Sequence, residues 1–99
     1  MNLSKHKRIK DKKVIAACRK NYCEVCGRQA NIEPHHIFTV GSGGCDIKEN
    51  LIQLCTDCHI RAHTEGVNKM ALLMVIAHRE DTTADALYIA NRRSMGWNV

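Results

Sequence analysis

Aromatic residues and proline are scarce in this sequence, and it contains no long apolar run. Phe, Trp and Tyr make up 4% of the 99 residues, and there is a single proline. The longest apolar run, Met70 to Ala77, is far shorter than the ~20 residues that cross a bilayer. The polar, basic start lacks the apolar stretch of a secretory signal. We therefore expect a cytoplasmic protein with reduced thiols and no membrane partner.

Six cysteines stand out in so short a chain. A chain of this length supports one domain with a modest core, and such domains often need a metal or disulfides to be stable. Four of the cysteines form two pairs of identical spacing, Cys23-x2-Cys26 and Cys55-x2-Cys58. In a reducing compartment paired cysteines more often bind metal than form disulfides, and a tetrahedron of four thiolates suits zinc. The spacing therefore predicts a structural zinc site rather than disulfides or ordinary buried cysteines.

Cys18 and Cys45 lie outside this pattern. Cys18 shares an expected helix face with Val14 and Ile15, which favours a role in core packing. Cys45 follows a glycine-rich segment and could be either a surface thiol or an accidental metal binder.

Local patterns predict a helix, a cysteine turn, two strands and three further helices, in that order. The first helix is expected within 11–20, the cysteine turn at 22–28, and β-branched or aromatic strands at 36–40 and 51–54. Glycines at 41, 43 and 44 predict a flexible loop between the strands.

The three later helices are expected from their caps and their apolar periodicity. Thr56 or Asp57 can cap a helix that runs through His63 and ends at Gly66. Residues 70–79 form the next helix. Thr82 and Asp85 resemble a capping box that opens the last helix, which extends to about residue 93.

Four of the six histidines fall in two tight sets. His59 and His63 are four apart on an expected helix, so their rings share one face and can grip one ion. His35 and His36 are consecutive on an expected strand, so their side chains point to opposite sides. One histidine of this pair can therefore be a ligand while the other faces a substrate.

Phosphodiester hydrolysis needs such an asymmetric arrangement. A metal ion neutralises the charge that develops on the phosphorus centre and the departing oxygen, and a neutral histidine can activate water. The alternative is that all four histidines are surface or zinc-site residues, and a His pair four apart is weak evidence alone. Because this His pair directly follows a zinc-type cysteine pair, the four histidines together are stronger evidence for a catalytic metal site.

Positive charge is concentrated near the start of the chain. The formal net charge is +5, and residues 5–13 carry six Lys or Arg residues against one acid, Asp11. This run includes Lys12 and Lys13 and suits a polyanionic partner. A solvated basic tail and a nucleic-acid arm remain equal alternatives on charge alone.

The paired cysteines and the clustered histidines together resemble the HNH, or ββα-metal, nuclease family. The resemblance covers roughly 22–64, and its core is Glu33-Pro34-His35-His36-Ile37, then Asn50-Leu51, then His59-x3-His63. The chain also resembles the subset in which two Cys-x2-Cys pairs clamp this motif with zinc. The resemblance implies an α+β fold, a small zinc-stapled, treble-clef-like ββα-metal core with flanking helices.

The resemblance also implies a role for each residue of the motif. His35, His59 and His63 would hold the catalytic divalent ion, and His36 would be the general base that deprotonates the attacking water. Asn50 would hydrogen-bond backbone and hold the hairpin loop, so the expected catalytic residues are His36, Asn50 and His59. An all-histidine ligand set favours Zn, Mn, Ni or Co over Mg, although Mg is abundant in cells.

Double-stranded DNA is the partner that the resemblance implies, and cleavage would leave 5′-phosphate and 3′-hydroxyl ends. Low sequence specificity is expected, because no separate recognition module is evident and contacts to the DNA backbone dominate. Arg61 lies between the two helix histidines and should point away from them, towards either a phosphate contact or a salt bridge. Lys12 and Lys13 are further candidates for nucleic-acid binding.

Three regions are expected: a basic arm with a short helix at 1–20, the HNH core at 21–66, and a helical extension at 67–99. Small HNH proteins often occur in phage and prophage genomes beside packaging genes, so phage packaging proteins are possible partners. The rival interpretations are a non-catalytic zinc-finger module that binds DNA and an interaction domain of a larger complex. In the latter case Leu87, Tyr88 and Ile89 would form an interface, whereas plain core is favoured.

Overall fold

A computed structural model of the protein describes residues 7–64 and 68–97. Its helices and strands follow the predicted order, with two short 3-10 helices added between the strands. The elements are α1 (Lys12–Ala17), β1 (Glu33–His36), η2 (Val40–Ser42), η3 (Lys48–Asn50), β2 (Leu51–Leu54), α2 (Thr56–Thr64), α3 (Lys69–Glu80) and α4 (Ala84–Ser94). Within the described ranges, no helix is long and apolar enough to cross a membrane.

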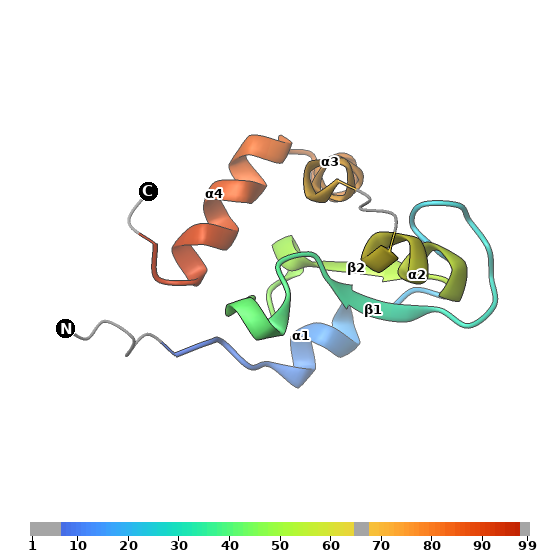
Figure 1. The fold of residues 1–99 in the computed structure, drawn as a ribbon, viewed down its shortest axis with the longest axis horizontal. Coiled ribbons are helices and arrows are strands. Elements are labelled where there is room, and N and C mark those ends of the chain that lie inside the picture. Colours follow the sequence, from blue (N-terminus) through green and yellow to red (C-terminus); the bar gives the residue numbers. More distant parts are fainter. Residues whose placement is uncertain (1–6, 65–67, 98–99) are drawn as a thin grey trace.

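The two strands form an antiparallel hairpin that lies at the centre of the molecule (Figure 1). The register pairs His35 with Ile52 and His36 with Leu51. Because paired residues share a face and successive residues alternate, His35 and His36 lie on opposite faces of the sheet. Figure 1 places α2 and α3 on one side of the hairpin and α1 on the other.

The expected strand over 36–40 is wrong, because β1 ends at His36. Backbone pairing continues for one more bond, from Ile37 N to Asn50 O at 3.0 Å. Beyond it, the side chain of Asn50 takes both polar groups of the Phe38 backbone. A side chain thus replaces the next rung of the ladder, and the chain turns away at Thr39.

The expected flexible loop over 41–44 is instead a tight turn. Residues 40–42 form η2, and Gly43 ends it with a left-handed φ of 97°. Gly44 is buried, and a Cβ there would lie 1.6 Å from the carbonyl oxygen of Phe38. Glycine is needed at this position because another part of the backbone approaches too closely for any side chain.

The first helix is shorter than expected and contributes no buried residue. Asp11 caps α1 by accepting hydrogen bonds from the backbone N–H groups of Lys13 and Val14. Cys18 follows the helix and is only half-buried. The predicted role of Cys18 in core packing is therefore wrong. Cys45 is fully buried, which contradicts a surface thiol, and no cluster of potential metal ligands among the described residues includes it.

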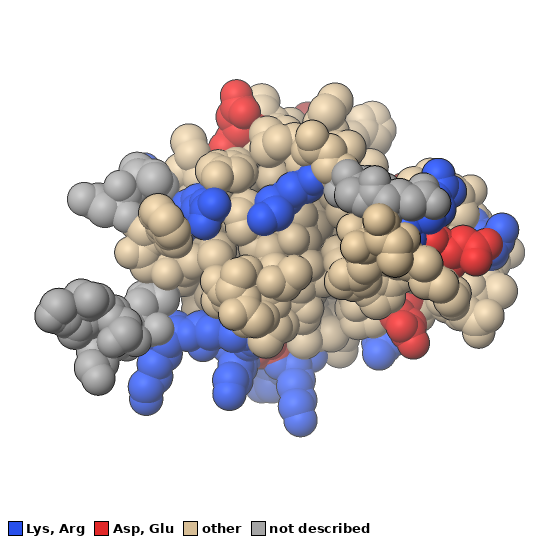
Figure 2. Space-filling view, in the orientation of Figure 1, with Lys and Arg blue, Asp and Glu red and all other residues tan. Residues whose placement is uncertain are grey.

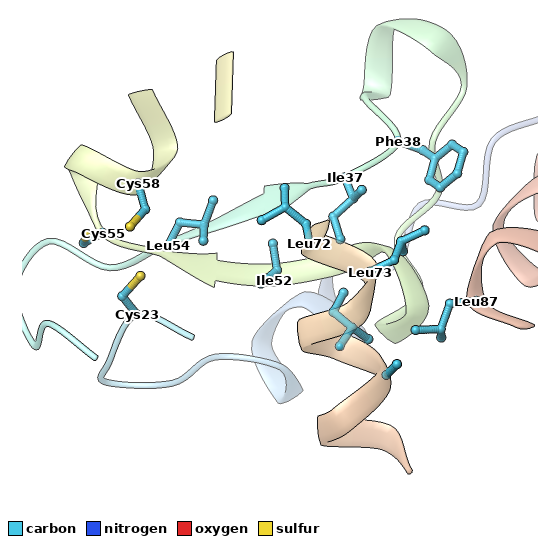
Figure 3. Packing of buried hydrophobic residues seen from close by; sticks show 12 residues of the cluster. Cys23, Ile37, Phe38, Ile52, Leu54, Cys55, Cys58, Leu72, Leu73 and Leu87 are labelled. Atoms are coloured by element: carbon cyan, nitrogen blue, oxygen red, sulfur yellow. The ribbon is translucent and has the colours of Figure 1, made fainter. Parts of the chain in front are cut away.

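The core lies between the hairpin and α3, with a contribution from α4 (Figure 3). Every residue of β2 is buried, and α3 buries Leu72, Leu73, Ile76 and Ala77. Figure 3 shows cysteines gathered at one end of the hairpin and Phe38 near Leu73 and Leu87 at the other end. Burying a large aliphatic side chain contributes about 1.5–3 kcal/mol, so these residues supply most of the apolar stabilisation.

The last helix confirms the expected core role of Leu87, which is 3% exposed, whereas Ile89 is exposed. Its cap differs by one residue from the prediction, because Thr83 rather than Thr82 accepts the hydrogen bond from Ala86 N. The predicted end of α2 at Gly66 lies outside the described residues, and the helix is described as far as Thr64.

A half-buried arginine, Arg79, joins α3 to the hairpin. Arg79 donates to the backbone carbonyls of Leu51 and Lys48, at 3.1 and 2.8 Å, and to the carboxylate of Glu24. Glu24 in turn accepts a hydrogen bond from Gln53 N at 2.7 Å. Helix α3 is thus fixed to the same hairpin that carries His35 and His36.

Candidate metal centres and active site

The four paired cysteines converge at one end of the hairpin. The first pair lies in a turn closed by bonds from Cys23 N to Arg28 O and from Gly27 N to Cys23 O. The second pair joins the end of β2 to the first turn of α2. The four sulfur atoms lie within 4.8 Å of one another.

This cluster fits a tetrahedral zinc ion. A zinc ion with Zn–S bonds of about 2.3 Å places its sulfur ligands roughly 3.8 Å apart, and the Cys26 and Cys55 sulfurs are 3.6 Å apart. No disulfide links any of the six cysteines, all of which lie in described segments. The cluster is therefore compatible with the predicted zinc site and not with the disulfide alternative.

Protonation of the four thiols also favours a cation among them. Burial raises the pKa of Cys23, but hydrogen bonds from the backbone N–H groups around it outweigh this and lower the pKa to about 6. Burial and the neighbouring thiols raise the pKa of Cys58 to about 12. Four adjacent thiolates repel one another, so the last proton leaves only when a positive charge compensates them.

Three histidines from β1 and α2 form a second cluster. His35 comes from β1, while His59 and His63 lie one turn apart on α2. The ring centroids are 5.0 Å apart for His35 and His59, 5.2 Å for His35 and His63, and 4.9 Å for His59 and His63. One nitrogen of each ring lies within 4.8 Å of the others, so the three can share one ion.

The environment of His35 keeps its imidazole neutral. Burial is the main cause that lowers its pKa to about 4, and the neighbouring His59 and His63 lower it further. A neutral imidazole is the form that binds a metal ion. His59 also faces a carboxylate, because its Nδ1 lies 3.8 Å from Oε1 of Glu33.

His36 lies on the opposite face of β1 but reaches the same pocket as the three-histidine cluster. The pocket has a volume of about 190 Å³ and is lined by Pro34, His35, His36, Thr39, Val40, His59 and His63. Within the part of the chain that the structure describes, β1 is an edge strand whose only partner is β2. Side chains from both faces of β1 can therefore border one space at its unpaired edge. A potential base and three potential metal ligands thus border one space.

Asn50 is fully buried and does not line this pocket. Its Oδ1 accepts a hydrogen bond from Phe38 N at 2.6 Å, and its Nδ2 donates to the carbonyls of Phe38 and Cys45, each at 3.0 Å. The amide therefore joins both ends of the loop that contains η2. It contacts backbone only, so any effect on catalysis is through the position of the loop.

The expected nucleic-acid residues lie in two separate places. Lys12 and Lys13 are exposed in the first turn of α1. Figure 2 shows lysine and arginine side chains along one edge of the molecule, over α1 and the segment that leads into it. Arg61 borders an apolar cavity with Leu54, Cys58 and Leu72, so the structure does not bring it to the histidine pocket.

Two residues of this site were not anticipated from the sequence. Asp46 is 4% exposed, and its Oδ1 lies 2.7 Å from Nε2 of His36. The guanidinium of Arg8 lies 2.7 Å from the same oxygen. A single aspartate ten residues after a histidine has no periodic relationship to it, so only the folded loop reveals the contact.

Two comparisons with known proteins bear on this arrangement. Residues 23–65 match the family model described as HNH endonuclease. The chain is also similar to the type IV methyl-directed restriction enzyme EcoKMcrA of Escherichia coli (strain K12), at 36% identity over 53 aligned residues. That match covers 44% of this chain and 19% of the relative, so the chain spans about a fifth of the relative's length. The segment matched by the family model contains both the cysteine cluster and the three-histidine cluster.

Proposed function

Because residues 23–65 form an HNH endonuclease domain, we propose that the protein is a metal-dependent endonuclease that hydrolyses phosphodiester bonds of double-stranded DNA. The observation that carries this proposal is the shared pocket, in which His36 borders the same space as His35, His59 and His63. A zinc-stabilised module that only binds DNA does not need a fourth histidine beside such a cluster. Nuclease chemistry needs both a base and a ligand set at one point.

In this proposal His36 is the general base. It accepts the proton of a water molecule that attacks the phosphorus in line with the departing 3′-oxygen, which leaves 5′-phosphate and 3′-hydroxyl ends. Asn50 keeps the loop after β1 in place and thereby aims His36. A divalent ion held by His35, His59 and His63 would supply positive charge to the phosphate oxygens and the leaving group.

The proposed cofactors differ in their roles. Cys23, Cys26, Cys55 and Cys58 would hold a structural zinc ion, which would fix the start of α2 because Cys58 directly precedes His59 in the chain. The catalytic site has nitrogen ligands only, which favours Zn, Mn, Ni or Co, with Mg as the cellular alternative.

The proposed DNA contacts are mainly to the backbone. Lys12 and Lys13 are exposed in the first turn of α1, within the basic N-terminal segment, so they are proposed to bind DNA phosphates. Arg61 lies away from the pocket, so a phosphate contact there would fall outside the cleavage point. We propose 21–66 as the catalytic unit, 1–20 as a basic arm and 67–99 as a supporting extension. Phage packaging partners remain a prediction.

Plasmid nicking by the wild type, with Mn, Ni, Co, Zn or Mg added, tests the proposal. His36→Ala should lower the cleavage rate by about 10²- to 10⁴-fold, the usual contribution of a general base. Zinc content and DNA affinity should stay at the wild-type level. His78→Ala is the matched control, because it removes an exposed histidine of α3 outside the pocket.

Chelation is a weaker control here, since it removes structural zinc as well as the catalytic ion. Zinc content and helicity should therefore be measured in the same sample. DNA binding without cleavage under any of these metals would contradict the nuclease and favour the non-catalytic DNA-binding module. Equal cleavage by the wild type and His36→Ala would contradict the role of His36.

A further inference from the structure

A buried carboxylate touches the proposed base from the face of β1 opposite to the metal ligands. Asp46 lies in the loop between η2 and η3, and its Oδ1 is 2.7 Å from His36 Nε2. An ionised carboxylate only accepts hydrogen bonds. A neutral imidazole has one N–H, so this contact places the proton on Nε2 and leaves the lone pair on Nδ1.

The carboxylate is itself held from the N-terminal side. Arg8 Nη2 donates to Oδ1 at 2.7 Å, and the backbone N–H of Asp11 donates to Oδ2 at 2.8 Å. Burial raises the pKa of Asp46, but the contact with His36, the Asp11 N–H and the charge of Arg8 outweigh it and lower the pKa. Asp46 therefore stays ionised near neutral pH, and its two oxygens have fixed partners.

The backbone of the same N-terminal segment is fastened to the loop as well. Asp46 N donates to Ile9 O at 2.9 Å, and Ile9 N contacts the Cys45 sulfur at 3.2 Å. Residues 8–11 thus run beside residues 45 and 46 with both backbone and side-chain bonds. The basic segment is attached to the loop that orients His36.

We propose that Asp46 is a positioning residue for His36, and that residues 8–11 complete the nuclease site by holding Asp46. The inference rests on the proposed function for its effect on cleavage. Asp46 keeps the Nε2–H form of the imidazole, so that Nδ1 is the nitrogen that accepts the proton from water. The N-terminal segment then contributes to the rate of cleavage as well as to the affinity for DNA.

The tautomer of His36 tests the geometry without any cleavage assay. Long-range ¹H–¹⁵N spectra of the zinc-loaded wild type, in alkaline buffer where histidine is neutral, should show a protonated Nε2 and an unprotonated Nδ1 for His36. The reverse assignment would overturn the inference. If the wild type cleaves no DNA, the proposed function fails, while this spectrum still decides whether Asp46 fixes the ring.

Cleavage by variants tests the consequence. Asp46→Ala should lower the single-turnover rate at saturating DNA by about 10- to 100-fold, which is typical of residues that orient a reacting group. Its DNA dissociation constant and zinc content should stay within about twofold of the wild type, and its His36 ring should show both tautomers. Asp85→Ala is the matched control, because it removes an exposed carboxylate from the first turn of α4.

Arg8→Ala tests the contribution of the N-terminal segment and keeps the test decisive if Asp46→Ala does not fold. It should lower the same single-turnover rate several-fold. Arg19→Ala removes an equal charge from an exposed position and should leave that rate unchanged. An unchanged rate in folded Asp46→Ala would overturn the positioning role. A change in DNA affinity alone for Arg8→Ala would overturn the role of residues 8–11.

Discussion

The side-chain amide of Asn50 pairs with the backbone of Phe38 as a neighbouring strand would. Its oxygen accepts from Phe38 N at 2.6 Å, and its nitrogen donates to Phe38 O at 3.0 Å. The two residues are twelve apart in sequence, and both are at most 1% exposed. The amide therefore closes the loop that separates the two strands and sets the position of the chain directly after His36.

Asn50→Ala should destabilise the protein and also impair cleavage. Leaving a buried hydrogen-bonding group without a partner costs about 1–3 kcal/mol, and this change affects three bonds, so we expect a loss of about 3 kcal/mol or more. Urea unfolding of the zinc-loaded protein measures it. Asn91→Ala is the control, because Asn91 is equally buried and donates to Glu49 O and Leu87 O.

At urea concentrations below those that unfold either variant, Asn50→Ala should cleave DNA far more slowly than Asn91→Ala when the folded fractions are equal. Equal activity of the two variants would show that Asn50 serves stability alone.

Substitution by alanine should destabilise the protein at Gly44 but have little effect at Gly41. A Cβ at Gly44 would overlap the Phe38 carbonyl and lie 3.0 Å from Nδ2 of Asn50, whereas nothing lies within 4 Å of a Cβ at Gly41. Gly44→Ala should lower the free energy of unfolding by about 1–3 kcal/mol or more, because the obstruction is backbone and cannot move aside cheaply. Gly41→Ala should change it by about 0.5 kcal/mol at most. Thermal unfolding of both variants measures the difference, and equal stabilities would contradict the close approach at Gly44.

Replacement by serine should abolish zinc binding at Cys58 but not at Cys18. Zinc binding in small structural sites is worth roughly 10–16 kcal/mol, which is as large as the whole stability of a typical domain, about 5–15 kcal/mol. Cys58→Ser should therefore lose bound zinc and unfold. Cys18→Ser should keep one structural zinc per chain, because Cys18 lies outside the cysteine cluster. Metal analysis and circular dichroism of the purified variants test this, and a folded, zinc-loaded Cys58→Ser would refute the proposed ligand set.

The lowered pKa of His35 predicts a loss of stability in mild acid when the catalytic ion is absent. The native pKa is about 4 against 6.5 for an unperturbed histidine. The unfolded chain therefore binds a proton as the pH falls below 6.5, while the native state remains neutral until about 4. The stabilising effect is complete above pH 6.5 and declines across this window.

His35→Gln removes this titration. Between pH 7 and pH 5 the wild type should lose about 2 kcal/mol more of its free energy of unfolding than His35→Gln does. Urea unfolding at the two pH values, with structural zinc present, measures the difference. The same pH dependence in both proteins would mean that His35 is protonated as readily in the native state as in the unfolded one.

The sequence predicted elements where local pattern and tertiary packing agree. The apolar residues of α3 and β2 face the core as their periodicity requires, and the two cysteine pairs meet as their matched spacing indicates. The expected strand over 36–40 failed because Asn50, far along the chain, takes the bonds of Phe38. The glycine segment was expected to be flexible because its composition does not reveal the nearby carbonyl that makes Gly44 necessary.

The histidine set could be assembled from spacing on a helix and alternation on a strand, which are local rules. The contact between Asp46 and His36 could not, because it depends on how the loop folds back and on residues 8–11 reaching it. Such contacts join segments with no common period. They emerge only when the tertiary arrangement is known.

The contacts of Arg79 determine how long a segment must be moved if the domain is to be inserted into another protein. It lies outside the 23–65 segment that the family model matches, yet its guanidinium binds the carbonyls of Lys48 and Leu51 and the carboxylate of Glu24. A graft of residues 23–65 into another scaffold would leave those three acceptors without their donor and would expose the apolar side of β2. The transferable cassette for protein engineering therefore extends at least to the end of α3.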